Sequence, residues 1–409
     1  MSLVNFMYKP FDIDRFRAQF PFLQQHPTAV YLDSAATTLR PSALIEATSQ
    51  FYCSAGSVHR SQYDWQQTQQ FEQARQLVAD LLQAEDQTCI IWTSGTTHSL
   101  NSIAYGLLHR FQPGDEIIIS EAEHHANFVI WQQLAQQHQF KLIVLPLLPD
   151  YQLNLEALKT ALSLRTKVVA LNFVSNVTGY RQPIERITPL IRQTSPNAMI
   201  VLDAAQAVLH QPISLQQLDV DFLAFSAHKL FGPTGLGVLT GKKSALQQLT
   251  PLFFGGKMVK QVTQQQTTLQ ELPYRLEAGT PNIAAVIGFG AVLQWLQQYD
   301  FSQLMAYTQQ LAQQFRHRFA QYPNCQLFSD PHSHIISFTF TGIDNSDLAT
   351  LLSEQQIALR TGQHCAQPYL HFLQQRGTLR LSLAPYNHQQ DFTRFFQALD
   401  NALALLEEE

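Results

Sequence analysis

The stretch 221-DFLAFSAHKLFGPTGLGVL-239 joins an apolar run to a lysine and then to residues typical of turns. A short apolar run bounded by glycine and proline is typical of a buried strand in a mostly parallel sheet. Lys229, one of only nine lysines in the chain, therefore comes directly after the end of a predicted strand. A lysine held in apolar surroundings has a lowered pKa and is a competent nucleophile toward an aldehyde. A surface lysine at a turn would give the same local pattern.

The same alternation extends on both sides of this stretch. Helical apolar spacing is clear in 71–82, and helical stretches also separate several of the strand-like runs, as at 127–138 and 154–163. This rhythm predicts an α/β layer fold with a mostly parallel seven-stranded sheet between helices, from about Tyr31 to about Ala285. The seven apolar runs are TCIIW, DEIIIS, FKLIVLPL, TKVVALNFV, AMIVLDA, DFLAFSA and GVLTG.

The pattern changes toward the C-terminus. A long helical stretch at 286–319 is followed by a strand, a helix, a turn-rich segment, the strand LRLSL and a final helix. We therefore predict an N-terminal segment (1–30) that packs on a small domain, a large α/β domain (31–290) and a smaller α+β domain (291–409). The Gln-rich stretch KQVTQQQTTLQEL, at 260–272, has little apolar periodicity and is predicted to be a loop.

The composition excludes several classes of protein. Of 409 residues, 45% are hydrophobic and 14% charged, with a net charge of -5, so there is no electrostatic case for nucleic acid. No apolar run approaches the roughly 18 residues of a membrane helix, and the first residues lack a signal-peptide pattern. We therefore expect a cytoplasmic protein that does not associate with a membrane. The four cysteines are too dispersed for a structural zinc site or a disulfide scaffold, so no metal is expected. They are Cys53, Cys89, Cys325 and Cys365.

Polar residues at the ends of other strands suggest a cofactor. In 198-AMIVLDAAQAVLH-210 a strand ends at Asp203, and Gln206 follows. An acid at the carboxyl end of a strand in an α/β sheet points into the ligand crevice. Pyridoxal phosphate needs both a lysine for its aldehyde and an acid that keeps its ring nitrogen protonated. Taken alone, Asp203 would also serve as a helix cap.

Three further stretches follow strands in the same way. In 93-TSGTTHSLNS-102 a glycine and two threonines begin a helix, which suits a phosphate group or an ordinary N-cap. In 121-EAEHHANFV-129 one histidine can lie against a cofactor ring while the other caps the helix. Asn176, in 171-LNFVSNVTGY-180, can donate to a ring oxygen. It is improbable that all five stretches place such residues at strand ends by chance.

Together these stretches resemble the cysteine desulfurases of the class V branch of fold-type I pyridoxal phosphate enzymes. The motifs are SAHKLFGPTGLGVL, LDAAQ, SGTT, EHHANFV, YLDSAATT, RLEAGTPN and RTGQHCAQP, and they span about residues 31–383. The short RTGQHCAQP segment resembles the group II enzymes. The family resembled includes the cysteine sulfinate desulfinases and selenocysteine lyases. QHCAQP and SVHRSQ look closest to the cysteine sulfinate desulfinase type, and His59 and Arg60 of the second motif are expected near the mouth of the site.

The resemblance implies a role for each matching residue. Lys229 would bind the cofactor covalently, His124 would stack on its ring, and Asp203 would pair with its ring nitrogen. Thr280 would reach the phosphate in the partner subunit of a homodimer. Asn176 and Gln206 would contact the ring oxygen, and the phosphate would be held by Thr96, Thr97, Ser226 and His228. Relatives often carry Glu where this chain has His98, so hydrogen bonding there is expected to differ.

Substrate residues lie in the C-terminal part. Arg380, in LRLSL, alternates with leucines and can bind a carboxylate through two parallel bonds, although an exposed strand arginine would fit the same pattern. Arg360 is a second candidate. Cys365 of 360-RTGQHCAQP-368 would accept sulfur as a persulfide, because a thiolate attacks sulfur readily, and His364 or Arg360 could favour the thiolate.

The predicted function is removal of sulfur from L-cysteine, or of selenium or sulfinate from its analogues, which leaves L-alanine. The persulfide would pass to a small acceptor protein, for iron–sulfur cluster assembly, tRNA thiolation or another pathway. Another reaction on the same scaffold, aminotransfer or kynureninase-like β-cleavage, stays an alternative. A non-enzymatic scaffold is a more distant one, since such a protein would be expected to lose the lysine or the acid.

Overall fold

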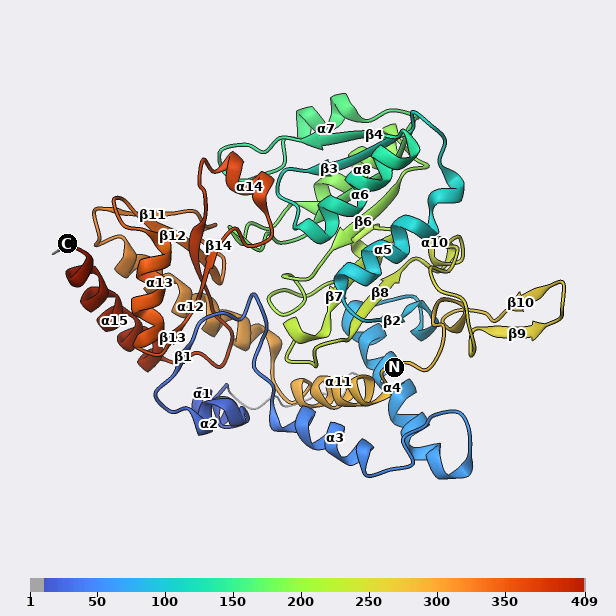
Figure 1. Cartoon of the computed structure of the whole chain (residues 1–409), viewed down its shortest axis with the longest axis horizontal. Coiled ribbons are helices and arrows are strands. Elements are labelled where there is room, and N and C mark those ends of the chain that lie inside the picture. Colours follow the sequence, from blue (N-terminus) through green and yellow to red (C-terminus); the bar gives the residue numbers. More distant parts are fainter. Residues whose placement is uncertain (1–10, 408–409) are drawn as a thin grey trace.

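The computed structural model describes residues 11–407, and the first part of the predicted N-terminal segment lies outside them. Its main sheet has seven strands in the order β2-β8-β7-β6-β5-β3-β4, which confirms the predicted sheet (Figure 1). All neighbours pair in parallel except β8, which is antiparallel to both β2 and β7. The strands are β2 (Ile91–Thr93), β3 (Glu116–Ser120), β4 (Lys141–Leu145), β5 (Thr166–Asn172), β6 (Met199–Asp203), β7 (Phe222–Ser226) and β8 (Gly237–Gly241).

The sheet is covered on both faces, and only the edge strand β4 is largely exposed or half-buried. Successive residues of a strand point to opposite faces, so the apolar side chains of each buried strand enter two cores. Ile117 and Ile119 of β3 pack in a core with α5 (Thr96–Gly106) and α6 (His125–His138). Ile118, between them, belongs to the core on the other face, with residues of α8 (Ile184–Thr194). A strand that is buried on both sides reads as a continuous apolar run, which is why these strands were visible in the sequence.

A second sheet of four antiparallel strands has the order β11-β12-β15-β14. Its strands are β11 (Cys325–Leu327), β12 (Ile335–Phe340), β14 (Arg360–Gly362) and β15 (Thr378–Ser382). Its core includes leucines of β15 and aromatic residues of α12 (Phe301–Phe319) and α15 (Gln389–Glu407). The division of the chain at about residues 30 and 290 into domains stays a prediction.

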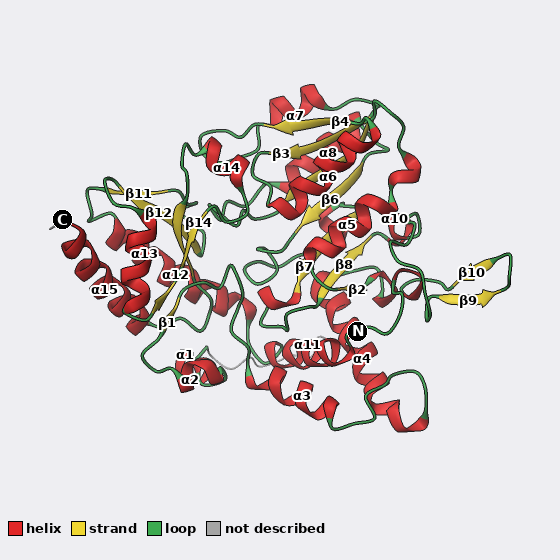
Figure 2. Cartoon of the chain, viewed as in Figure 1, coloured by secondary structure: helices red, strands yellow, loops and turns green. Residues whose placement is uncertain are grey.

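The remaining elements connect or cover the sheets (Figure 2). α11 (Ile283–Leu296) packs against α3 (Ser42–Tyr52) and α4 (Trp65–Leu82). α11 and α12 are separate helices, because Asp300 caps a new helix start by accepting from Ser302 N. The others are α1 (Ile13–Arg17), α2 (Pro21–Gln25), α7 (Leu155–Ala161), α9 (Leu215–Leu218), α10 (Lys243–Leu246), α13 (Asn345–Glu354), α14 (Gln367–Phe372), β1 (Val30–Tyr31) and β13 (Ile357–Ala358).

The prediction of a loop at 260–272 is wrong. The segment forms most of a hairpin of β9 (Val259–Val262) and β10 (Thr267–Leu269), which projects from the body of the molecule in Figure 1. Most of its residues are exposed, so neither face needs the apolar alternation that normally reveals a strand. Within residues 11–407, every helix is too short or too polar to span a lipid bilayer.

Candidate active site

A cavity of about 240 Å³ lies at the carboxyl ends of β5, β6 and β7. Twelve of the thirteen site residues predicted from the sequence line it. This placement follows from the fold, since the carboxyl ends of neighbouring parallel strands open onto one crevice. The lining includes Thr96, Thr97, His124, Asn176, Asp203, Gln206, Ser226, His228, Lys229, Arg360, Cys365 and Arg380, together with Ala35, Ala36, Ala126, Asn172, Val174, Ala205 and His364.

Lys229 follows β7 in a single helical turn, and its ammonium lies inside the cavity. The Nζ atom donates to the carbonyl oxygen of Ala35 at 3.0 Å, and Gln206 Nε2 donates to the same oxygen at 2.8 Å. Burial lowers the pKa of Lys229 to about 8, with Arg380 adding to the effect and Asp203 opposing it. An amine with this pKa is partly neutral near physiological pH and is therefore a competent nucleophile.

Asp203 ends β6 and is almost completely buried. Its Oδ1 atom accepts from Ala205 N at 2.9 Å. Burial raises the pKa of its carboxyl group, while that hydrogen bond and the charge of Lys229 oppose the rise. A buried carboxylate without an ion pair is costly, so this side chain is suited to a cationic partner in the cavity, such as a protonated ring nitrogen.

The first turn of α5 forms a cradle with the end of β7. Thr96 N donates to Ser226 Oγ at 2.8 Å, and the two hydroxyl groups are 2.7 Å apart. His228 Nδ1 is buried without a hydrogen-bond partner. A Cβ atom on Gly237 would lie 2.4 Å from Gly95 Cα, so only glycine lets β8 approach this loop. Backbone N–H groups at a helix start, hydroxyl groups and a free imidazole nitrogen together suit a phosphate.

His98, the residue that departs from the family pattern, faces a different cavity. Its Nδ1 accepts from Ser94 N at 3.1 Å, and its ring meets Phe253 edge-on at 5.3 Å between centroids. Burial lowers the pKa of His98. The residue therefore fixes the turn before α5 from outside the small cavity.

His124 is the N-cap of α6 and lines the small cavity. Its Nδ1 atom accepts from Ala126 N at 3.1 Å, so the neutral ring carries its proton on Nε2. Burial lowers the pKa of His124 to about 4, and the charge of Lys229 adds to the effect. The sequence thus supplies a neutral imidazole whose orientation is set by the helix start.

Arg380 and Arg360 are register partners on β15 and β14 but lie in different environments. Arg380 is buried, and it donates from Nη1 to the carbonyl oxygen of Asn176 at 2.8 Å and from Nη2 to Asp33 Oδ1 at 3.1 Å. Its Nε atom is buried without a partner. Arg360 is exposed at the rim of the cavity. The N–H groups of Arg380 that have no partner are therefore shielded from water, whereas those of Arg360 are exposed to it.

Cys365 is exposed and lies in a tightly held turn. His364 and Cys365 both have positive φ angles, of 52° and 55°. Asn176 Nδ2 donates to the carbonyl oxygen of His364 at 2.7 Å, and His125 N donates to that of Cys365 at 2.8 Å. The His364 ring is buried against Thr378 at 2.9 Å. Burial lowers the pKa of His364 to about 3, with Arg380 adding to the effect, so this ring is neutral and cannot supply the charge suggested above.

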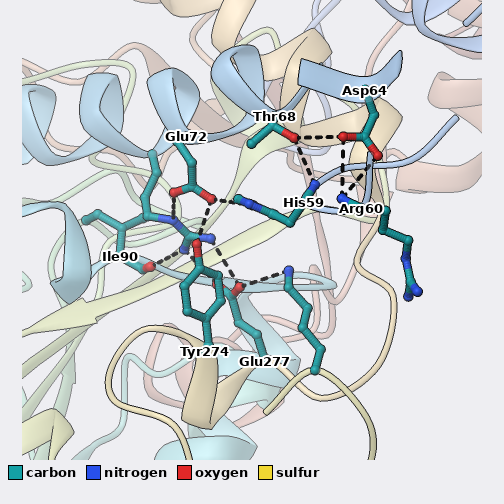
Figure 3. Close-up of polar contacts among 10 residues, drawn as sticks. His59, Arg60, Asp64, Thr68, Glu72, Ile90, Tyr274 and Glu277 are labelled. Carbon is teal, nitrogen blue, oxygen red and sulfur yellow. Dashed lines mark hydrogen bonds and ion pairs between the residues drawn. The ribbon is translucent and has the colours of Figure 1, made fainter. Parts of the chain in front are cut away.

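Three residues that the sequence placed at or near the site, Thr280, His59 and Arg60, do not line the small cavity. Thr280 lines a larger cavity of about 770 Å³, which shares Thr97 with the small one. His59 and Arg60 do not line the small cavity in the single chain. His59 instead contacts Glu72 at 3.0 Å, and its backbone N donates to Thr68 Oγ1 at 2.8 Å (Figure 3).

The network drawn in Figure 3 centres on a buried ion pair. Arg75 donates from Nη1 to Glu277 Oε1 at 2.7 Å and from Nη2 to Oε2 at 3.1 Å, and both side chains are buried. Glu277 also accepts from Trp92 N at 2.8 Å. Glu277 begins the EAGTP segment, so this pair fixes the approach to Thr280.

Sequence reasoning missed three contributors to the site. The carbonyl group of Ala35 holds Lys229 and Gln206, and a backbone acceptor leaves no signature in residue type. Asp33 holds Arg380; its position directly after the apolar run at 30–32 was the available signal. Glu123 is completely buried beside the cavity, next to the histidine pair that attracted attention instead.

Comparison with known proteins identifies relatives over nearly the whole chain. Residues 30–395 match the aminotransferase class-V family. A probable cysteine desulfurase of Haemophilus influenzae is 58% identical over 396 residues, which cover 97% of this chain and 90% of that protein. The cysteine desulfurase CsdA of Escherichia coli is 47% identical over 400 residues, 97% and 99% of the two chains.

A solved structure agrees with these sequence matches. The crystal structure of Escherichia coli CsdA in its S-sulfonic acid form superposes with a TM-score of 0.92 at 46% identity, covering 97% of this chain and all of that one. The resemblance inferred from the motifs and the predicted fold class are thereby confirmed. This chain belongs to the aminotransferase class-V family and, within it, to the cysteine desulfurases.

Proposed function

We propose that this protein is a pyridoxal phosphate-dependent cysteine desulfurase that converts L-cysteine to L-alanine and leaves a persulfide on Cys365. The proposal rests on one observation: a single cavity is lined by the amine of Lys229, the buried carboxyl group of Asp203 and the thiol of the exposed residue Cys365. When bound, pyridoxal phosphate supplies an aldehyde that links to amines and a ring that accepts electrons from the substrate carbon.

The residues present fit this cofactor. Lys229 would bind the aldehyde, Asp203 would accept from the ring nitrogen, and the neutral imidazole of His124 would pack against the ring face. Gln206 and Asn176 would contact the ring oxygen. Asn176 also donates one N–H of its amide to the carbonyl oxygen of His364 in the cysteine turn. The phosphate is assigned to Thr96, Thr97, Ser226 and His228, whose unpaired Nδ1 supports the assignment.

The chain's own residues then bind the substrate, move its protons and accept its sulfur. Arg380 takes the substrate carboxylate through donors left free by Asn176 and Asp33, and Arg360 adds positive charge at the rim. Lys229 removes the proton from the substrate α-carbon. The Cys365 thiolate attacks the substrate sulfur, so that an S–S bond forms as the C–S bond breaks. The β-carbon takes the proton that Cys365 released on becoming a thiolate, and Lys229 returns its proton to the α-carbon, which gives alanine and balances the reaction.

A homodimer is part of the proposal. The larger cavity, which Thr280 lines, adjoins the phosphate cradle through Thr97. Phe253 lines the same cavity and is 59% exposed, and its neighbour Phe254 is 67% exposed. Large exposed aromatic side chains beside a cavity are typical of a protein interface, so we assign this surface to a second copy of the chain.

A small acceptor protein is the second proposed partner. Cys365 is exposed at the mouth of the cavity, where another thiol can reach a terminal sulfur. Selenocysteine and cysteine sulfinate fit the same carboxylate and amine contacts, and we include them in the proposed substrate range. Cys365 argues against aminotransfer, since that reaction has no use for a thiol at this place.

The proposal is tested by following the sulfur. In Cys365→Ala, cysteine should no longer load sulfur onto the protein, while the absorbance of the bound cofactor is retained. Cys53→Ala is the matched control, because Cys53 is also an exposed free thiol but does not line the cavity. Mass spectrometry of the intact protein after exposure to cysteine reports the persulfide. Borohydride reduction should place a pyridoxyl label on Lys229; a label elsewhere, or persulfide in Cys365→Ala, refutes the assignment.

A further inference from the structure

The carboxyl group of Glu123 is buried under the cavity and has no role in the reaction described above. Its Oε1 atom lies 2.5 Å from Ser120 Oγ, a contact in which an ionised carboxylate accepts and a protonated carboxyl group donates. Asn172 Nδ2 donates to Oε1 at 3.1 Å, and Asn127 Nδ2 donates to Oε2 at 2.7 Å. Every donor in this set is neutral. Within residues 11–407, no Lys, Arg or His side chain forms an ion pair with Glu123, so an ionised carboxylate here would be buried without a counter-charge.

Asn172 connects this group to the cofactor pocket. Its Nδ2 atom donates to the carbonyl oxygen of Ala122 at 2.9 Å as well as to Glu123. Because both partners are acceptors, the amide orientation is fixed, and the Oδ1 atom faces elsewhere. That atom is buried without a partner, and Asn172 lines the cavity.

Asn172 and Asp203 are also register partners at the ends of β5 and β6. Their side chains project from the same face of the sheet on strands about 5 Å apart. Asn172 therefore contacts Glu123 directly and lies beside Asp203 on the sheet. Two buried carboxylates this close cannot both be ionised cheaply, as in other carboxyl pairs that share a site.

Of the two acids, Asp203 has the access to a cationic partner. It lines the cavity opposite Lys229, whereas Glu123 does not line it. The other titratable groups near Glu123 are His124, next in the chain and neutral, and Asp203 itself. We propose that below neutral pH Glu123 is a neutral carboxylic acid, with its proton donated to Ser120 Oγ, while Asp203 carries the charge. Glu123 would then be a positioning residue that holds Asn172 beside Asp203.

The electrostatics agree with this geometry. Burial raises the pKa of Glu123 to about 7; Asp203 adds to the rise, and hydrogen bonds from Ser120, Asn127 and Asn172 oppose it. The group therefore loses its proton as the pH rises through neutrality. The new negative charge would then act together with that of Asp203 and would favour protonation of a cofactor nitrogen bound at Asp203.

The test reads the carboxyl proton directly. Holoenzyme labelled with ¹³C-glutamate should show an infrared band of a protonated carboxyl group at pH 6 that disappears in one step centred near pH 7. The band should be absent from Glu123→Gln and present in Glu121→Gln, a matched control two residues away whose side chain does not line the cavity. Absence of the band from wild-type holoenzyme between pH 5 and 8, or its survival in Glu123→Gln, overturns the proposal.

A second measurement follows the bound cofactor, and this arm rests on the function proposed above. The pH midpoint of the cofactor absorbance should be lower by about one unit in Glu123→Gln than in wild type, because the neutral amide cannot add the negative charge. Identical midpoints overturn the electrostatic coupling. If wild type shows no cofactor absorbance at all, the proposed function fails, while the infrared result still decides the protonation of Glu123.

Discussion

Replacing Arg380 with lysine tests how the substrate carboxylate is bound. The substitution keeps a positive charge on β15 but replaces a planar fork of five N–H donors with a single ammonium. In the structure, Nη1 already serves Asn176 and Nη2 serves Asp33, while Nε is buried and free. The free edge of the guanidinium can therefore offer two parallel bonds to a carboxylate, of which lysine can replace one.

The expected loss follows from that count. A hydrogen bond to a charged group contributes about 1.5–3 kcal/mol. Losing one of two such bonds should lower kcat/KM for L-cysteine by roughly 10- to 150-fold, since every 1.4 kcal/mol is tenfold. Arg360→Lys is the matched control: the side chain is exposed, and surface substitutions usually change free energies by about 0.5 kcal/mol or less, which is roughly twofold.

A pair of ligands separates carboxylate binding from structural damage. L-Alanine and ethylamine differ only in the carboxylate, and both can be titrated into the holoenzyme by following cofactor absorbance. Arg380→Lys should weaken alanine but leave ethylamine almost unchanged. Equal weakening of both ligands would mean that Arg380 acts by holding Asn176 and Asp33 in place. A larger effect from Arg360→Lys would mean that Arg360, at the rim, is the residue that binds the carboxylate.

Three further outcomes are expected. The pKa of Lys229 is lowered to about 8, and only its neutral amine attacks the aldehyde. The rate at which the cofactor binds the apoprotein, measured by stopped-flow absorbance, should therefore rise about tenfold from pH 7 to pH 9 and then level off. A rate that continues to rise to pH 10 contradicts the lowered pKa. Glu277→Ala leaves the buried Arg75 guanidinium with only the partly exposed Glu72 as an ionic partner, and should lower the free energy of unfolding by about 3 kcal/mol in urea titrations, the low end of the range for breaking a buried pair; replacing both residues by apolar ones should recover most of the loss. Gly237→Ala forces its new methyl group against the loop before α5, at a cost of about 1–3 kcal/mol, so the affinity for the cofactor in equilibrium dialysis should fall about tenfold. Gly255→Ala is the control: there is open space around Gly255, so the affinity should not change.

The parts of the fold that could be predicted are those with local causes. The buried strands of the main sheet are apolar on both faces, and several polar site residues lie at the last position of a strand or three positions beyond it. Lys229, Asp203 and Thr96 were found in this way, and the parallel topology alone brings their strand ends to one crevice. The β9–β10 hairpin was missed because an exposed strand has no apolar face to reveal it.

The parts that could not be predicted depend on pairs far apart in the sequence. Arg75 and Glu277 are separated by 202 positions, and neither is unusual in its own segment. The same holds for Arg380, whose pattern fitted an exposed strand until β15 was found packed between β12 and β14. A residue type and its spacing report the local structure, whereas burial and partners are properties of the assembled sheets.

The cysteine turn shows how the two sheets share one reaction. By sequence, Cys365 belongs with the four-stranded sheet, since it lies between β14 and β15. Its backbone, however, is held by donors from the other side: His125 N, next to the residue assigned to the ring face, and Asn176 Nδ2 one residue earlier in the turn. Two consecutive non-glycine residues at positive φ persist only where surrounding contacts impose them. The position of the Cys365 thiol is therefore set by residues of the cofactor site itself. Asn176 holds both this turn, through its side chain, and Arg380, through its carbonyl group, so the sulfur acceptor and the carboxylate-binding residue are tied to the same residue.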